Sequence, residues 1–124
     1  MKITLLGAGA WGTALAIAFA GKHDVTLWSR EADVAVDLQK TRENTRFFPG
    51  YKLPETVGVV TDFAAAVAGA ERLIVATPIA GLRPTAERLK EVGCTLPLLW
   101  VCKGFEAGSG KLPHQVVAEV LGTQ

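Results

Sequence analysis

The sequence lacks a strong excess of charge of either sign and has no long hydrophobic run. Thirteen Lys and Arg residues stand against 12 Asp and Glu residues, for a formal net charge of +1. Scattered charges of both signs argue against a surface built for nucleic acid or an anionic membrane. No run can span a bilayer, and no secretory hydrophobic region follows Met1. We therefore expect a cytoplasmic protein whose partners are small molecules.

Cysteine is scarce as well. Cys94 and Cys102 form neither a CxxC pair nor a zinc-ligand spacing, so we expect two packing thiols and no metal site. Internal repeats and low-complexity segments are also missing. With 49% hydrophobic and 20% charged residues in 124, the chain is predicted to be one domain, residues 1–124, with one core.

Short apolar runs alternate with segments of helical periodicity. Five runs are predicted to be buried strands, at residues 3–6, 25–28, 57–60, 73–76 and 98–102. Helices are predicted at residues 10–20, 31–40, 84–92 and 113–121, with a short one after Thr61 and Asp62 that stops near Gly69. Residues 41–56 are predicted to form a loop over the site, because Pro49, Gly50 and Pro54 interrupt them.

This alternation predicts an α/β fold of the Rossmann type, with a doubly wound, mostly parallel sheet and helices on both faces. Ligands of such sheets bind outside the carboxyl ends of the strands. The loops that matter most are therefore residues 7–12, 77–81 and 103–110.

The first of these loops has the pattern G-x-G-x-x-G. Gly7 suits a tight turn, Gly9 a close approach of the backbone to a pyrophosphate, and Gly12 close contact between helix and strand. The pattern follows a predicted strand and opens a predicted helix, whose N-terminus attracts anions. It predicts a dinucleotide site, the alternative being a glycine-rich structural turn. Trp11 either packs over the cofactor or fills the core.

The second predicted strand ends at Trp28, Ser29 and Arg30. An NAD-selective fold carries an acid at this point for the ribose hydroxyls, and here a hydroxyl and a guanidinium stand instead. Arg30 therefore favours NADP, with its 2′-phosphate. The alternatives are that Arg30 is a solvated residue stacking on adenine, that Glu31 reaches the ribose, and that both cofactors are used.

Lys103 follows the fifth predicted strand, and Gly104 lets the chain turn sharply after it. Its ammonium is predicted to point into the crevice and to bind an anionic substrate, although many lysines are merely exposed. His23 follows the first helix at the wrong edge of the sheet, and His114 opens the last helix. We expect both to be surface residues.

Several segments, taken together, resemble the N-terminal domain of bacterial-type NAD(P)-dependent glycerol-3-phosphate dehydrogenases. The similarity covers nearly the whole chain. It rests on GAGAWGTAL from Gly7, LWSR from Leu27, NTRFFPG from Asn44, ATP from Ala76 and KGFE from Lys103.

The resemblance implies reduction of dihydroxyacetone phosphate to glycerol 3-phosphate for phospholipid synthesis, with NADP or NAD. It implies that Lys103 contacts both cofactor and substrate. It also implies a second, helical domain that supplies the catalytic base, a lysine, and holds the substrate phosphate, and it is compatible with a homodimer of the full-length protein. The predicted cofactor contacts are Gly7, Gly9, Ala10, Trp11, Gly12, Arg30, Phe47, Pro78 and Lys103.

Two positions depart from the pattern of the family. Phe47 stands where tyrosine is common, and Ile79 stands where serine is usual, so a hydroxyl contact is missing at each place. Two alternatives stay open. One is another β-hydroxyacid-type dehydrogenase, such as a ketopantoate reductase-like protein, against which the segment from Asn44 to Gly50 argues. The other is a non-catalytic module that senses NAD(P)H.

Overall fold

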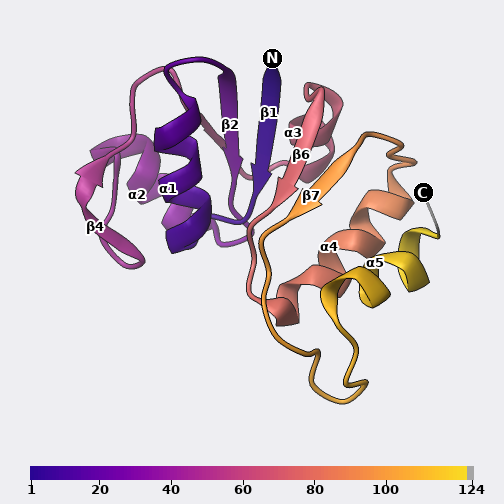
Figure 1. Ribbon diagram of the computed structural model, residues 1–124. Helices are drawn as coiled ribbons and strands as arrows, with labels where there is room; N and C mark the ends of the chain where they lie inside the picture. Colours follow the sequence, from indigo (N-terminus) through magenta and orange to yellow (C-terminus); the bar gives the residue numbers. More distant parts are fainter. Residues whose placement is uncertain (123–124) are drawn as a thin grey trace.

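The computed structural model describes residues 1–122 as a parallel sheet with helices on both faces (Figure 1). The strands follow the order β5-β2-β1-β6-β7, and every neighbouring pair is parallel. They are β1 (Lys2–Leu6), β2 (Asp24–Trp28), β5 (Gly58–Val60), β6 (Arg72–Val75) and β7 (Leu98–Trp100). The helices are α1 (Ala10–Phe19), α2 (Ala32–Thr41), α3 (Phe63–Ala68), α4 (Ile79–Glu91) and α5 (Pro113–Leu121). A sheet that grows outward from β1 in both directions is doubly wound, so the predicted fold class is confirmed.

The expectation of one core is wrong, because the sheet separates two, and the side chains of the central strands β2, β1 and β6 alternate between them. Ile3 and Leu5 of β1 pack into the core under α1 and α2, whereas Leu6 joins the core under α3, α4 and α5. The Thr4 hydroxyl also points to the second side, where it donates to the carbonyl of Ala66 at 2.9 Å. Burial on both faces explains why the strands are nearly continuous apolar runs.

Most helices end close to the capping residues that the sequence predicts. The Asp62 carboxylate caps α3 by accepting from the amide of Ala65 at 3.1 Å. Gly122 ends α5 with a φ of 83°. Side-chain acceptors and positive-φ glycines satisfy the unpaired ends of a helix, so these signals can be recognised from local sequence.

The loop predicted for residues 41–56 is partly wrong. This segment contains an antiparallel hairpin of β3 (Glu43–Asn44) and β4 (Phe48–Lys52). Arg42, in the left-handed region with a φ of 60°, fixes the start of the hairpin to the segment between β4 and β5 by donating to the carbonyls of Pro54 and Val57. Pro49 and Gly50 inside a five-residue strand, and a partner of two residues, conceal the alternation that predicts strands.

The start predicted for α4 is also wrong. The helix begins at Ile79 after Pro78, and Pro84 lies inside it. Proline within a helix removes one backbone hydrogen bond, but Leu82, Ala86 and Leu89 bury the same face of α4, and this burial outweighs the loss. The fifth strand stops at Trp100, two residues before the predicted end.

Candidate functional site

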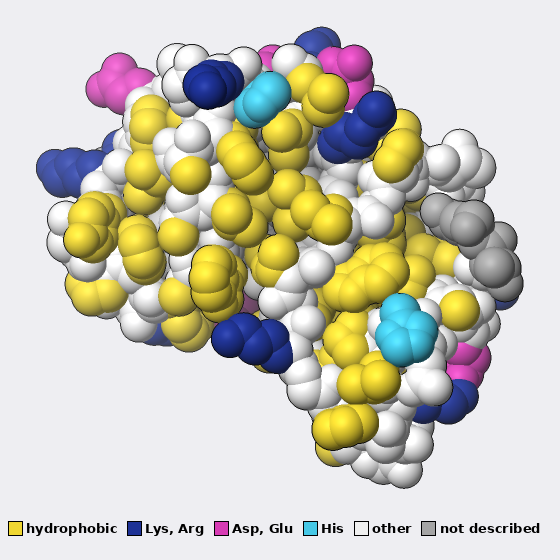
Figure 2. Space-filling model, viewed as in Figure 1, with side chains coloured by type: hydrophobic (Ala, Val, Ile, Leu, Met, Phe, Trp, Pro, Cys, Tyr) yellow, Lys and Arg dark blue, Asp and Glu magenta, His cyan; other side chains and the backbone are white. Residues whose placement is uncertain are grey.

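A crevice of about 780 Å³ opens at the carboxyl ends of the strands. The three predicted loops converge on it, together with the end of β2 and the first part of α4. Figure 2 shows the molecular outline indented below the strand ends, with mostly hydrophobic side chains on this face. The wall is formed by Gly7 to Trp11, Trp28 to Glu31, Val34, Phe47, Ala76 to Gly81, Pro84, Thr85, Arg88 and Val101 to Lys103.

The three glycines of the first loop occupy different environments. Gly7 has a φ of 121°, and a Cβ there would lie 3.0 Å from the backbone of Ala76. A Cβ at Gly12 would lie 1.8 Å from the carbonyl oxygen of Gly7. At Gly9, with a φ of −80°, a Cβ would meet no atom of the described residues within 4 Å. Gly7 and Gly12 are therefore required by the fold, whereas Gly9 borders open space in the crevice.

The start of α1 faces this space. Its first intrahelical bond joins the amide of Thr13 to the carbonyl of Gly9 at 3.1 Å, so the amides of the first turn have no helix carbonyl to bond. No acidic residue occupies that turn. Free amides and the positive end of the helix dipole make this point suitable for an anionic group.

Asn44 connects the hairpin to the glycine loop. Its side chain is 3% exposed; it donates to the carbonyl of Ala8 at 2.7 Å and to the Thr13 hydroxyl at 2.8 Å, and it accepts from the amide of Phe47. The sequence alone gives no signal for this role, because the burial of Asn44 and its long-range hydrogen bonds are known only from the structure. Through it, Phe47 is held at the crevice wall.

Trp11 lies at the mouth of the crevice with 57% of its surface exposed. It therefore does not fill the core.

Charged residues surround the end of β2. Arg30 is exposed and lines the crevice, and among residues 1–122 no carboxylate pairs with it. Arg46 pairs with Glu31 and Asp33 at 3.0 Å each, and its hydrogen bond lowers the pKa of Asp33. The Ser29 hydroxyl is engaged in the turn, where it donates to the carbonyl of Glu31. Arg30 is thus an exposed cation at this end that has no carboxylate partner within residues 1–122.

Lys103 is exposed and lines the opposite part of the crevice beside Cys102. Burial raises the pKa of the Cys102 thiol, which lies 3.8 Å from the Thr77 hydroxyl. Both cysteines are free and pack against the core under α4, as expected of packing thiols.

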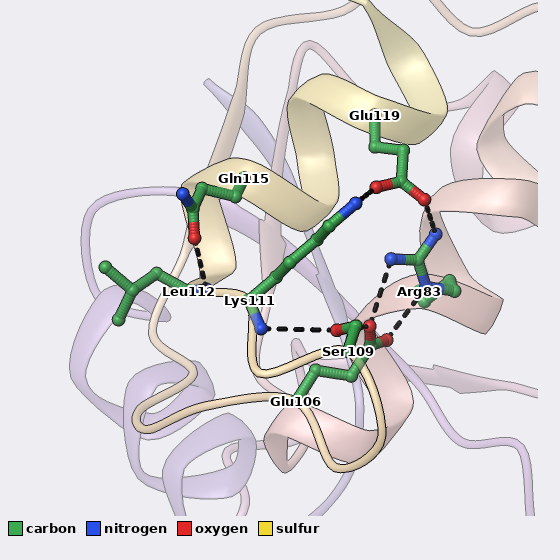
Figure 3. Close-up of polar contacts among 7 residues, drawn as sticks. All are labelled: Arg83, Glu106, Ser109, Lys111, Leu112, Gln115 and Glu119. Carbon is green, nitrogen blue, oxygen red and sulfur yellow. Dashed lines mark hydrogen bonds and ion pairs between the residues drawn. The ribbon is translucent and has the colours of Figure 1, made fainter.

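An ion-pair network holds the loop that follows Lys103 (Figure 3). The Arg83 guanidinium on α4 donates to both oxygens of Glu106, at 2.8 and 3.0 Å. Arg83 also pairs with Glu119 on α5, which Lys111 contacts as well. The hydrogen bonds from Arg83 and Ser109 lower the pKa of Glu106 to about 2. This network has no local signal in the sequence, because Arg83 lies far along the chain from Glu106 and Glu119.

Most of the predicted site residues line the crevice. Gly12 is the exception, since it is buried behind the wall against Gly7. His114 is exposed on α5, and His23 packs edge-on against Phe19 before β2, so neither lines the crevice. Within the described residues, no group of His, Cys, Asp and Glu could hold a metal ion. No helix among them is long and apolar enough to cross a membrane.

Residues 2–124 match the family described as NAD-dependent glycerol-3-phosphate dehydrogenase N-terminus. The chain is 82% identical over its whole length to a glycerol-3-phosphate dehydrogenase (NAD(P)+) of Dechloromonas aromatica, and covers 38% of that protein. It is 52% identical over 122 residues to the enzyme of the same name from Aromatoleum aromaticum, covering 37% of it. The chain thus spans less than two fifths of the length of these curated relatives.

Solved structures show the same similarity. A crystal structure of glycerol-3-phosphate dehydrogenase from Coxiella burnetii superimposes with a TM-score of 0.89 at 36% identity, over 98% of this chain and 38% of the other. A prephenate dehydrogenase from A. aeolicus, at 10% identity and a TM-score of 0.64 over 98% of this chain and 38% of the other, shares the fold alone.

Proposed function

The chain belongs to the family of NAD-dependent glycerol-3-phosphate dehydrogenase N-termini, and from this we propose that it is the cofactor-binding part of an enzyme that interconverts dihydroxyacetone phosphate and sn-glycerol 3-phosphate with NAD(P)H. Such an enzyme is an oxidoreductase that feeds glycerophospholipid synthesis. Membership of the family also decides against the ketopantoate reductase-like alternative.

The observation that carries the proposal is the open space at Gly9. A pyrophosphate needs a backbone that it can approach closely, amide donors and a positive dipole, and the loop from Gly7 to the first turn of α1 provides all three. The crevice continues from this point toward Arg30 in one direction and Lys103 in the other. Its extent suits an elongated dinucleotide, with adenosine at the β2 end.

At the adenosine end, Arg30 is free to bind a 2′-phosphate because Arg46 occupies the neighbouring carboxylates of Glu31 and Asp33. Phe47 and Trp11 offer apolar surface beside the crevice, and Pro78 and Ala10 contribute to its walls. The cofactor is thus NADP or NAD, with Arg30 favouring NADP.

At the other end, the Lys103 ammonium is placed to orient an anionic substrate. When bound, the reduced nicotinamide supplies the hydride. Lys103 orients the ketone but cannot also deliver the proton that the developing alkoxide needs. By resemblance to the family, a lysine in a second, helical domain of a longer protein delivers that proton, and the same domain binds the substrate phosphate. A cytoplasmic location and a homodimer complete the proposal.

A turnover assay tests it. The full-length protein is mixed with dihydroxyacetone phosphate and each reduced cofactor, and the absorbance of the nicotinamide is followed. We expect oxidation of NADPH or NADH that depends on the ketone. A full-length protein that binds NADPH but oxidises none with this substrate would be a nucleotide-sensing module.

A further inference from the structure

The segment that carries Lys103 has little structure of its own. Between β7 and α5 the described chain has no helix or strand, and Gly104, Gly108 and Gly110 have φ values of 89°, 89° and 69°. Two backbone bonds close the loop on itself, from the amide of Glu106 to Lys111 and from the amide of Gly110 to Glu106. These bonds hold the shape of the loop, but they do not join it to the crevice.

The Arg83–Glu106 pair makes that connection. The guanidinium and the carboxylate form two parallel hydrogen bonds, and the side chains are only 25% and 14% exposed. Bidentate pairs of this kind fix orientation as well as distance. The Ser109 hydroxyl donates to the same carboxylate at 2.6 Å, so the loop is bound where it turns back toward α5.

Each partner lies close in sequence to a wall of the crevice. Arg83 lies between Gly81 and Pro84 of α4, both of which line the crevice, and Glu106 is three residues beyond Lys103. Among the described residues, neither Arg83 nor Glu106 lines the crevice itself. The pair therefore joins α4 to the loop that follows Lys103, and Figure 3 shows the two side chains pointing toward each other.

We propose that Arg83 and Glu106 are positioning residues, which act through Lys103 by holding its segment at a set distance from the start of α4. The inference rests on the proposed function, because it takes Lys103 to contact the cofactor and the substrate. It extends that function by making the ion pair behind the crevice a determinant of affinity within it.

A purely structural pair would behave differently. Its loss would lower the melting temperature and would weaken binding equally whether or not Lys103 were present. A pair that acts through Lys103 loses its effect on binding once the lysine is removed. Coupling between the two positions therefore distinguishes the two roles.

The experiment is a double-mutant cycle in the full-length protein, with dissociation constants for NADPH measured by fluorescence well below the melting temperature. Lys103→Ala is expected to raise the dissociation constant about tenfold, the loss of one charged contact. Glu106→Gln is expected to raise it roughly three- to tenfold, and the double variant to match Lys103→Ala within about twofold. The KM for dihydroxyacetone phosphate should rise in the same pattern.

Glu87→Gln is the matched control, since Glu87 lies one turn from Arg83 on α4 but, among the described residues, pairs with no residue of the loop that follows Lys103. It should leave the dissociation constant unchanged. If Glu106→Gln does not fold, Arg83→Lys keeps the charge but not the two parallel bonds, and should weaken binding in the same direction by less.

If the losses of affinity multiply in the double variant, or if Glu87→Gln loses as much affinity as Glu106→Gln, the positioning role is overturned while the proposed function stays intact. An unmutated protein that does not bind NADPH would overturn the proposed function, and the positioning role with it.

Discussion

The glycines of the G-x-G-x-x-G motif have different roles. A side chain at Gly12 would collide with the carbonyl of Gly7, whereas a side chain at Gly9 would enter only the space left for a ligand. Gly9 also has a φ that any residue adopts. Substitution at Gly9 should therefore separate binding from folding, which substitution at Gly12 cannot do.

We predict that Gly9→Val weakens NADPH binding at least about tenfold, because it blocks the amides that receive the pyrophosphate. The melting temperature should change little. Fluorescence titration and thermal unfolding measure the two effects. Gly21→Val is the control, since Gly21 also borders open space at an end of α1 but lies away from the crevice. Unchanged affinity in Gly9→Val would show that the loop does not hold the cofactor.

Arg30 allows a test of cofactor choice. Arg30→Asp removes the partner of the 2′-phosphate and adds an acceptor for ribose hydroxyls, so the ratio of the dissociation constants for NADPH and NADH should rise about tenfold to a hundredfold. Titration with each cofactor measures it. Arg72→Asp, on an exposed residue at the far end of β6, is the control. A constant ratio in Arg30→Asp would mean that Arg30 lies outside the site.

At the scale of elements, the hairpin of β3 and β4 is attached to the crevice through Asn44. We predict that Asn44→Ala costs about 1–3 kcal/mol of unfolding free energy, because the buried carbonyl of Ala8 and the amide of Phe47 each lose a partner. Cofactor affinity should fall too, since Phe47 loses its anchor. Denaturant unfolding with and without NADPH measures both.

Thr45→Ala serves as the control for Asn44, because Thr45 is the exposed neighbour in the same hairpin. Full stability of Asn44→Ala would show that the hydrogen bonds of the side chain are replaced by water.

Where α4, α5 and the loop that follows Lys103 meet, the contribution of Glu106 to the free energy of unfolding depends on pH. Folding lowers the pKa of Glu106 from 4.5 to about 2, so its contribution to stability is complete above about pH 4.5 and is lost as the pH falls toward 2. The destabilisation caused by Glu106→Gln should therefore be constant above about pH 4.5 and should shrink below it. Denaturant unfolding between pH 2 and 7 measures this. A difference independent of pH would exclude the ion pair as its source.

Elements that depend on neighbouring residues were predictable from the sequence, and those that depend on distant ones were not. The β1 and β2 runs, the cap at Asp62 and the end of α5 at Gly122 are local signals, and they were predicted to within a few residues. The β3–β4 hairpin and the Arg83–Glu106 pair depend on long-range contacts instead. Such contacts exist only after the chain has folded.

The same distinction holds for the site. The carboxyl-edge rule was enough to bring the loops at Gly9, Pro78 and Lys103 to one crevice, since parallel strands end at a common edge. It could not show that Asn44 supports the glycine loop from behind, or that Arg46 neutralises the carboxylates beside Arg30.

At the scale of the whole molecule, the proposed function divides the chemistry between the crevice and a second, helical domain. We predict that the 124 residues alone change the fluorescence of NADPH on binding but do not oxidise it with dihydroxyacetone phosphate, because the proton donor and the phosphate grip belong to the proposed helical domain. The full-length protein, assayed in parallel, is the positive control. Turnover by the isolated chain would return the search for a proton donor to Lys103 and His114.

The central place of β1 also has a consequence for synthesis on the ribosome. One edge of β1 can pair as soon as β2 has emerged, but the other must wait for β6, which ends at Val75. At roughly 5–20 residues per second, translation from the end of β2 to the end of β6 takes about 2–10 s. Throughout that interval the middle strand of the mature sheet is an open edge on the nascent chain, and Leu6 is not yet covered by α4 and α5.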